Sequence, residues 1–470
     1  DDVIHGDNRS SSSNIDSMAS IDRNLSSVIS QENKCLYSPG ANFNPSEDCR
    51  MMRRIIGEDP LWSLAIVPRL SDLCLQCIVD NFEGTLLISL TQKDLVQERL
   101  CLSLPLQLTA NLLPDGPYWR RCCQQKWDVC DVSQYDHSWK RMFFERHLKN
   151  IIELFIPNET DPNVVLHMVP LCKNYVKRLD ISQLLLPIKE HQREEEEDGS
   201  DLAVDTQYDV PGIDHFDFGI LLDKLTNLEE LHLMYGVKQC GMNFEWKMFE
   251  MTERDCESLG KAVKSCRTLK LLRLHQSHIE DKKCRLLVKY LMDHPCLREL
   301  DFSYNLIGDS GARAIGKLLT NSKLEILNMC DNNVSGVGAK AIAHALSKHS
   351  SLLSLNLRLN HLRDEGGEAI VEALLKNNTL RHLHLGGNKM TCLTAFALSQ
   401  VLVQNNSLKS INLSCNKLGE EGGKALEEAM SHNTSVTEFY ICLTEVNEQS
   451  VSSINQVVWT NQSLQLKKQA

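Results

Sequence analysis

The middle of the chain contains a pattern that could bind phosphate. Gly311 is followed by four residues and then by Gly316 and Lys317. This is the spacing of a loop whose backbone amides hold phosphates while the lysine reaches the terminal ones. A working loop of this kind follows a strand, opens a helix and supplies Ser or Thr after the lysine for Mg²⁺. Here Leu318 follows the lysine, and Ala312, Ile315 and Leu319 have helical spacing. We therefore expect a closely packed helix with Lys317 in solvent, and no nucleotide site.

Cysteine and histidine side chains raise the possibility of redox or metal chemistry. Cys74 and Cys77 form a CxxC pair, but no second pair follows. Both lie in an apolar run with helical spacing, so we expect buried thiols rather than ligands. A second group has a ligand-like composition but a spacing that fits no common zinc module, and it consists of Cys122, Cys123, Cys130 and His137.

Two further histidines, His382 and His384, alternate on one expected strand and therefore point to the same face. No acid or thiol flanks them to complete a metal site, so we interpret them as surface histidines at a contact face. No serine, cysteine or lysine nucleophile stands beside a recognisable base. The sequence predicts that the chain is not an enzyme and that it has no catalytic residue, no metal and no cofactor.

The bulk properties exclude several classes of partner. The chain has 470 residues and a formal net charge of −12, and no long basic run occurs. We therefore expect binding to neither nucleic acid nor an anionic membrane. No apolar run approaches the ~20 residues that a membrane span needs. The 18 cysteines are scattered through apolar positions of a long chain, which favours buried thiols in a reducing, intracellular compartment.

The elements that must position these side chains form a repeat. In five consecutive units, apolar residues at positions one, four and six are followed by an asparagine at position nine. The asparagines, of which the first two are 27 residues apart and the later ones 28 apart, are Asn305, Asn332, Asn360, Asn388 and Asn416. We interpret them as structural, because a side-chain amide can satisfy the backbone groups of a turn.

The second half of each unit has apolar residues at helical spacing, as in residues 338–350. Strand, turn and helix therefore alternate, which predicts an α/β solenoid. We expect a horseshoe with parallel strands on its concave face and helices on its convex face, similar to the ribonuclease-inhibitor class of leucine-rich repeats. The pattern weakens at both ends, where we place degenerate units at residues 151–156, 176–181, 228–233, 269–274 and 436–441.

Composition shifts suggest four regions. Residues 1–51 are rich in Ser and Asn and are expected to form a flexible or extended tail. Residues 52–146 have helical spacing and are expected to form a small helical domain whose aromatic residues are mostly core. Residues 147–434 are assigned to the repeats, with an acidic loop inserted at about 188–212. Residues 435–470 are assigned to a capping repeat and a tail.

The outward positions of the expected strands define the candidate contact face. They are mixed, small and mostly polar, which suits an extended protein partner and equally an unoccupied surface. The candidate contact residues are Arg273, Glu299, Asp301, Asn328, Asn356, Arg358, His382, His384 and Asn412.

Two segments outside the repeats carry a more specific resemblance. Residues 53–84 (RRIIGEDPLWSLAIVPRLSDLCLQCIVDNFEG) and 118–148 (YWRRCCQQKWDVCDVSQYDHSWKRMFFERHL) precede the repeat block. Together with that block, they resemble the t-complex-associated testis-expressed leucine-rich family of the axonemal nexin–dynein regulatory complex. The resemblance runs from about Met52 to the C-terminus and carries no catalytic motif.

The resemblance implies a non-enzymatic structural and regulatory subunit of motile cilia and sperm flagella. It would lie in the cytoskeleton of the cytoplasm, in the axoneme, within a hetero-oligomeric complex that links doublet microtubules and regulates dynein-driven sliding. Its partners would be the other subunits of that complex, with dynein and the doublet microtubules nearby. Because the chain is acidic, we expect attachment through sister subunits rather than through the acidic tubulin surface.

Two other functions share this domain order or this repeat. A helical N-terminal domain followed by leucine-rich repeats is also the order found in F-box adaptors of ubiquitin ligases, and residues 102–127 faintly resemble an F-box. The same repeat class occurs in GTPase activators similar to the Ran-activating protein. Both alternatives stay open on the sequence alone.

Overall fold

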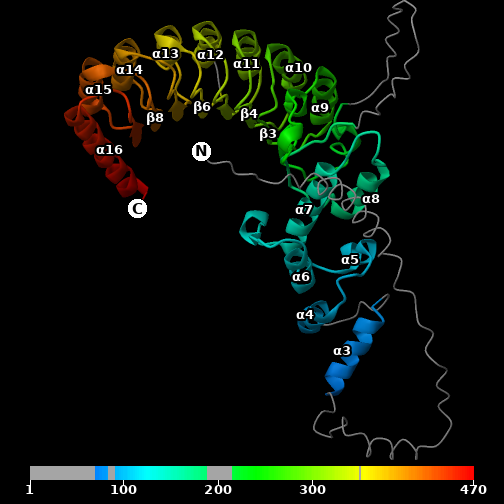
Figure 1. Ribbon diagram of the computed structural model, residues 1–470. Coiled ribbons are helices and arrows are strands. Elements are labelled where there is room, and N and C mark those ends of the chain that lie inside the picture. Colours follow the sequence, from blue (N-terminus) through cyan, green and yellow to red (C-terminus); the bar gives the residue numbers. More distant parts are fainter. Residues whose placement is uncertain (1–68, 83–89, 188–213, 349–350, 470) are drawn as a thin grey trace, which may run out of the picture. The chain divides into compact units, whose positions relative to one another are not determined.

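The apolar strand positions of the repeats build one parallel sheet. The computed structural model describes residues 69–82, 90–187, 214–348 and 351–469, and within them nine strands pair in sequence order from β1 to β9 (Figure 1). The strands follow one another along the inner side of an arc from β3 to β9, and the repeat helices stand along its outer side. The predicted α/β leucine-rich-repeat solenoid is therefore confirmed.

The strands are short, and each strand from β2 to β9 is followed by an α-helix. Their bounds are β1 Arg178–Ile181, β2 Glu230–Leu233, β3 Leu271–Leu274, β4 Glu299–Asp301, β5 Ile326–Asn328, β6 Ser354–Asn356, β7 His382–His384, β8 Ser410–Asn412 and β9 Glu438–Tyr440. The helices that follow β2 to β9 are α9 Glu253–Ser265, α10 Asp281–Leu291, α11 Asp309–Asn321, α12 Gly336–Lys348, α13 Arg363–Ala373, α14 Cys392–Gln404, α15 Gly419–His432 and α16 Glu448–Gln469.

The core lies between the sheet and these helices. In β1 to β8 a central leucine or isoleucine is fully buried, as Leu355 is in β6, and Phe439 takes this place in β9, while the residues on either side face the concave side. The helices contribute one apolar stripe each, such as Ile342 and Leu346 of α12. Every unit buries its apolar face against the next copy, so the interior is continuous along the solenoid.

The repeated asparagines bond adjacent units together. Each is buried, and its Nδ2 atom donates to a backbone carbonyl 30 or 31 residues earlier in the chain. In Asn305, for example, Nδ2 donates to the carbonyl of Leu274 at 2.8 Å, while Oδ1 accepts the amides of Ser277 and Ile279. These bonds satisfy turn backbone that would otherwise be buried without partners.

Aspartate side chains cap the N-termini of several repeat helices. The sequence reasoning missed this second series of bonds. Asp281 Oδ1 accepts the amides of Gly308 and Gly311, both at 2.8 Å. Asp309 accepts the amides of Ser335 and Gly338 in the next unit in the same way. A carboxylate from an earlier repeat therefore occupies the N-termini of α11 and α12, and Asp364 does the same at α14 by accepting the amides of Thr391 and Thr394. The helix dipole favours negative charge there.

These contacts decide whether the stretch from Gly311 to Lys317 can bind phosphate. Gly311 and Gly316 both lie inside α11, and the Gly311 amide is already bonded to Asp281. A Cβ at Gly316 would meet the backbone oxygen of Ala341 in α12 at 2.8 Å, so this glycine allows two helices to approach closely. Lys317 is exposed on the outer side. The predicted helix and its close packing are confirmed.

The earliest expected repeat is wrong. Residues 151–156 form no strand, because Ile151 and Ile152 belong to helix α7 (Trp139–Glu153), which ends just before Leu154. The first strand in the described part of the chain is β1, which follows helix α8 (Asn163–Cys172). Among the described residues between β1 and α9 there are three 3-10 turns, and their bounds are η3 Phe218–Ile220, η4 Gly241–Asn243 and η5 Trp246–Phe249.

The chain divides into two compact units between Lys140 and Arg141. The sequence boundary at residue 146 falls six residues later, within α7. The described part of the first unit contains mainly helices, namely α3 Leu70–Asp80, α4 Leu90–Arg99, α5 Leu106–Leu112, α6 Pro117–Lys126 and the turn η2 Val132–Tyr135. The expected tail (1–51), the acidic insertion (188–212) and Trp62 lie outside the described residues.

The first unit packs around Trp119, which is fully buried and meets Tyr118 edge to face. The buried Lys140 ammonium donates to the carbonyls of Ala110 and Leu113. The expectation of buried thiols at Cys74 and Cys77 is wrong. Both are exposed, because Leu75 is the only residue of α3 that is buried within the described part of the chain.

Candidate protein-contact surface on the concave face

Two rows of outward side chains cross the concave face from β1 to β9, and the parallel register fixes their order. The first row is Arg178, Glu230, Leu271, Glu299, Ile326, Ser354, His382, Ser410 and Glu438. The second row is Asp180, His232, Arg273, Asp301, Asn328, Asn356, His384, Asn412 and Tyr440. Charge is concentrated in the first four strands, and the remaining strands are mostly neutral.

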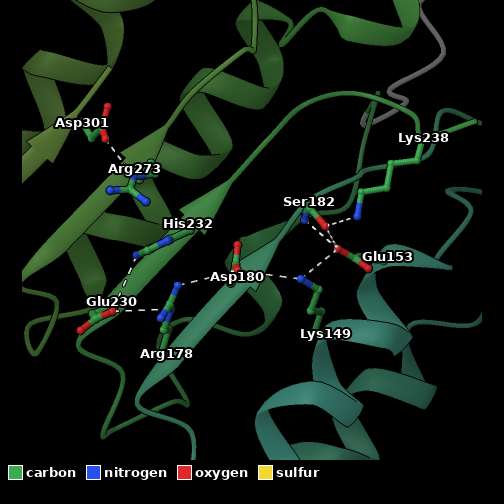
Figure 2. A network of polar contacts seen from close by, with 10 residues as sticks. All are labelled: Lys149, Glu153, Arg178, Asp180, Ser182, Glu230, His232, Lys238, Arg273 and Asp301. Atoms are coloured by element: carbon green, nitrogen blue, oxygen red, sulfur yellow. Dashed lines mark hydrogen bonds and ion pairs between the residues drawn. The ribbon is translucent and has the colours of Figure 1, made fainter. Parts of the chain in front are cut away.

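One end of the charged region is closed by strong hydrogen bonds. Glu153 Oε1, from α7, accepts the amide of Ser182 at 2.7 Å and its hydroxyl at 2.6 Å. The Lys238 ammonium in turn donates to the Ser182 hydroxyl. Figure 2 shows these three side chains converging beside the end of β1. Their polar atoms are paired with one another, so we regard them as the rim of the surface.

The other end is closed by an ion pair between neighbouring strands. Arg273 Nε donates to Asp301 Oδ2 at 2.8 Å, and Asp301 Oδ1 accepts the amide and hydroxyl of Ser303. The Asp301 side chain is only 5% exposed. Asp301 therefore occupies the expected row, but its carboxylate is already paired and covered.

Between these ends lies a group of charges with longer separations (Figure 2). Arg178 lies 3.7 Å from Glu230 Oε2 through Nε and 3.8 Å from Asp180 Oδ2 through Nη2. Lys149 lies 3.9 Å from the same Asp180 oxygen, and His232 Nε2 lies 3.7 Å from Glu230. All four separations are longer than a hydrogen bond allows. The cations Arg178 and Lys149 therefore attract these carboxylates without a hydrogen bond to them.

His232 is neutral in this setting. Burial lowers the pKa of its imidazole to about 4, and the positive charges of Arg178 and Arg273 add to this shift. Its side chain is 6% exposed, and Nε2 makes no hydrogen bond within the described residues. Burial also lowers the pKa of His275, which directly follows β3 and whose buried Nδ1 likewise lacks a hydrogen bond from the described residues. Buried polar atoms without a partner are uncommon.

The other half of the face carries most of the remaining expected contact residues. Asn328, Asn356 and Asn412 are partly exposed, and each accepts a backbone amide two residues further on. His382 is exposed, whereas burial lowers the pKa of the half-buried His384, with His382 and Arg358 nearby adding to the shift. This half offers dispersed amides and imidazoles and no concentration of charge.

The structure thus places all nine expected contact residues on or beside one face, although their role in binding stays a prediction. Sequence reasoning missed Arg178, Asp180, Glu230 and His232. The signal was present, because the units at 176–181 and 228–233 had been recognised and the same outward positions identify these four residues.

The described residues offer little for other chemistry. They contain no cluster of three or more His, Cys, Asp or Glu side chains that could hold a metal ion. Cys122 and Cys123 are buried in α6, Cys130 is partly buried and His137 is exposed. In the part of the chain that the structure describes, no helix has the length and apolar character needed to cross a membrane.

Comparison with known proteins agrees with the fold. A family model described as "Leucine Rich repeat" matches residues 293–316, 320–343, 348–371, 376–391 and 404–426. Together with the ordered parallel sheet, these matches show that the chain contains leucine-rich repeats.

More specific relatives exist. The chain is 46% identical over 316 residues to a protein of Macaca fascicularis, in a match covering 67% of this chain and 62% of the relative. It is also 46% identical over 317 residues to a protein of Mus musculus, with 65% and 64% covered. Both relatives are named Dynein regulatory complex subunit 5, and the chain is a homologue of the proteins with that name. The matched region spans less than two thirds of either relative.

Among solved structures, the chain is similar to an internalin of Listeria monocytogenes. The sequence identity is 17%, the TM-score is 0.32, and the match covers 50% of this chain and 67% of the internalin. This likeness is too weak to add to the description of the fold.

Proposed function

We propose that the protein is a subunit of a dynein regulatory complex and acts there as a non-enzymatic, protein-binding scaffold. The observation that carries this proposal is the 46% identity, over 316 residues, to a protein named Dynein regulatory complex subunit 5. Under this proposal the protein lies in the axoneme of motile cilia and sperm flagella. There it helps to link doublet microtubules and to regulate dynein-driven sliding.

The physical character of the molecule supports a scaffold. A one-dimensional stack of repeats presents separate inner, outer and end surfaces, so several partners can bind at once without competing. The concave face carries polar side chains in fixed register along nine strands. The candidate contact residues from Arg273 to Asn412 would form part of that interface.

Isolation of axonemes from ciliated cells expressing a tagged full-length chain tests the proposal. We expect the tagged chain to remain with the axoneme and to co-purify with other dynein regulatory complex subunits after salt extraction. Its absence from axonemes, or its recovery without any of those subunits, would overturn the assignment. A ubiquitin-ligase scaffold in the purified fraction would favour the F-box alternative. Acceleration of single-turnover GTP hydrolysis would favour the activator alternative.

A co-sedimentation assay tests the mode of attachment. The chain has a net charge of −12, so direct attraction to the acidic tubulin surface is disfavoured. We expect the purified chain to stay in the supernatant with bare microtubules at physiological salt and to pellet when other subunits are added. Pelleting without those subunits would contradict attachment through them.

A further inference from the structure

In the middle of the charged region, cations and carboxylate oxygens lie farther apart than in the hydrogen-bonded pairs on either side. On one side, Glu153, Ser182 and Lys238 are hydrogen-bonded to one another, and on the other, Arg273 is bonded to Asp301. We use the name open acidic group for Asp180, Glu230 and His232, which lie between them, together with Glu299, which lies on β4 two residues before Asp301. None of the three carboxylates in this group accepts a hydrogen bond from the described residues.

The open acidic group has more negative than positive charge. Asp180 and Glu230 are each more than two-fifths exposed and share Arg178, which lies beyond hydrogen-bond distance from both. Lys149 is nearer to Glu153 than to Asp180. Burial of Glu299 raises the pKa of its carboxyl; the positive charge of Arg273 opposes this shift, and the negative charges of Asp301 and Glu230 add to it. Asp180 and Glu230 thus share one arginine, and the only cation near Glu299 among the described residues is Arg273, which is already bonded to Asp301.

The positions of these carboxylates suit a cation of a particular shape. Glu230 and Glu299 lie in one row on either side of Leu271, two strand spacings or about 10 Å apart at their Cα atoms. Side chains leaning from both strands can reach a planar guanidinium that lies over Leu271. A guanidinium offers five N–H donors in a fixed fork, so it can bond two carboxylates at once, whereas a lysine ammonium is a compact point charge.

His232 supplies an independent observation that points to a ligand. Its imidazole is more than nine-tenths buried in this group, and Nε2 has no hydrogen-bond partner within the described residues. A neutral imidazole nitrogen can accept a hydrogen bond. Because two arginines already flank His232, it is unsuited to serve as a further cation for the carboxylates.

We propose that the open acidic group binds an arginine-bearing segment of a partner protein, with the guanidinium between Glu230 and Glu299. The proposal rests on the proposed function in one respect, namely that the partner is a protein subunit. Charge complementarity favours a basic segment over an acidic one, because the carboxylates here outnumber the free cation. The remaining polar half of the concave face would then receive the continuation of the same segment.

A binding assay with the full-length chain tests the chemistry without identifying the partner. The probe is a fluorescein-labelled Gly-Ser peptide carrying two arginines, compared with lysine and citrulline versions of the same peptide. We expect the arginine peptide to bind more tightly than the lysine peptide, and the uncharged citrulline peptide not to bind. The double variant Glu230→Gln with Glu299→Gln should weaken arginine-peptide binding about tenfold or more, as expected for charge-assisted hydrogen bonds.

The control is Glu438→Gln, which removes one carboxylate from the same row at the far end, on β9, and is compared with Glu230→Gln alone as well as with the double variant. We expect this variant to bind the arginine peptide within about twofold of the unchanged chain. If Glu438→Gln weakens binding as much as the double variant, the peptide responds only to the net charge of the chain, and the proposal fails. It also fails if the arginine peptide does not bind.

Thermal unfolding separates a binding role from a structural one. Removing crowded negative charges should leave the melting temperature of the double variant unchanged or higher, because no described hydrogen bond is lost. A clear fall would assign these carboxylates to stability and would count against the proposal. The Arg273–Asp301 pair is left intact in every variant.

A photo-cross-linking experiment in assembled axonemes tests the natural partner. A benzoylphenylalanine at position 271 should cross-link to a partner peptide that contains arginine close to the linked residue. Linkage to an acidic or wholly apolar segment would overturn the proposal. Failure of the chain to join axonemes at all would instead refute the proposed function, whereas the peptide-binding comparison would still report on the open acidic group.

Discussion

Truncation of one buried asparagine should weaken the solenoid far more than truncation of a neighbouring surface asparagine. Asn360 Oδ1 accepts the amide of Val334 at 3.0 Å, and Nδ2 donates to the carbonyls of Met329, Leu357 and Arg358. The residue is 1% exposed. Asn360→Ala removes all four bonds from one buried position.

The four bonds are not equal in cost. Each of the three carbonyls keeps a second donor, from Asn332, Asn388 or the amide of Asp331. The Val334 amide has no other partner within the described residues, so it would be left buried and unpaired. An unpaired buried donor costs about 1–3 kcal/mol, and three partly compensated bonds add roughly 0.5 kcal/mol each. We expect a total loss of about 3–4 kcal/mol.

Asn356→Ala is the matched control. It lies four residues earlier on the concave face, is partly exposed and accepts one local amide, that of Arg358, at 3.1 Å. We expect a loss of less than about 1 kcal/mol, because solvent can replace that bond. Urea unfolding would compare the two variants, and hydrogen exchange would follow residues 326–346, because long repeat arrays can unfold in parts. Equal losses in both variants, with unchanged exchange around Val334, would refute the reasoning.

Three further outcomes follow from the packing and from the titration of buried groups. His232 takes up a proton near pH 6.5 in the unfolded chain but only near pH 4 in the folded chain, so lowering the pH through that window should reduce the free energy of unfolding by up to about 3 kcal/mol. Urea unfolding of the unchanged chain and of His232→Gln at pH 7 and pH 4.5 checks this. The variant should lose less stability than the unchanged chain. Gly316→Ala should destabilise the fold by about 1–3 kcal/mol, because the added Cβ would meet the backbone of α12, whereas Lys317→Ala should be nearly neutral. Mg-ATP should not shift the melting temperature of either variant. A rise in melting temperature with ATP would favour the phosphate site. Maleimide should label exposed Cys415 in the native chain but Cys284 only after unfolding, because burial blocks access to the Cys284 thiol and raises its pKa. Peptide mapping of the labelled chain checks this, and labelling of Cys284 in the native chain would contradict it.

The repeat itself was readable from the sequence because every unit solves the same packing problem. A leucine at a fixed position must enter the interior, and an asparagine must bond the adjoining turn, so both recur at nearly constant spacing. Even the degenerate strands β1 and β2 were found by their buried leucines and isoleucine. The expected unit at residues 151–156 failed for a related reason. A short apolar run fits both a strand and the last turn of a helix, and only packing decided for α7.

Burial of single side chains in the helical region was harder to predict. Cys74 and Cys77 lie in an apolar run, yet α3 buries only Leu75 within the described residues. Helical spacing indicates that one stripe is apolar, but the neighbours that would cover the stripe come from elsewhere in the chain. The same limit applies to Asp301, whose row was predicted but whose burial and ion pair with Arg273 of the adjacent strand were not.

The sequence by itself determined the period, the parallel strand order and the direction in which each strand residue points, because these follow from local spacing repeated many times. Tertiary structure alone decided which polar groups meet. Asp281 reaches Gly311 across 30 residues, Arg273 reaches Asp301 across 28, and the Glu230 carboxylate finds no hydrogen-bond donor within the described residues. Such meetings depend on the register and separation of neighbouring repeats. For that reason the phosphate-like glycine proved to be bonded to a carboxylate, and the open acidic group emerged only from the assembled sheet.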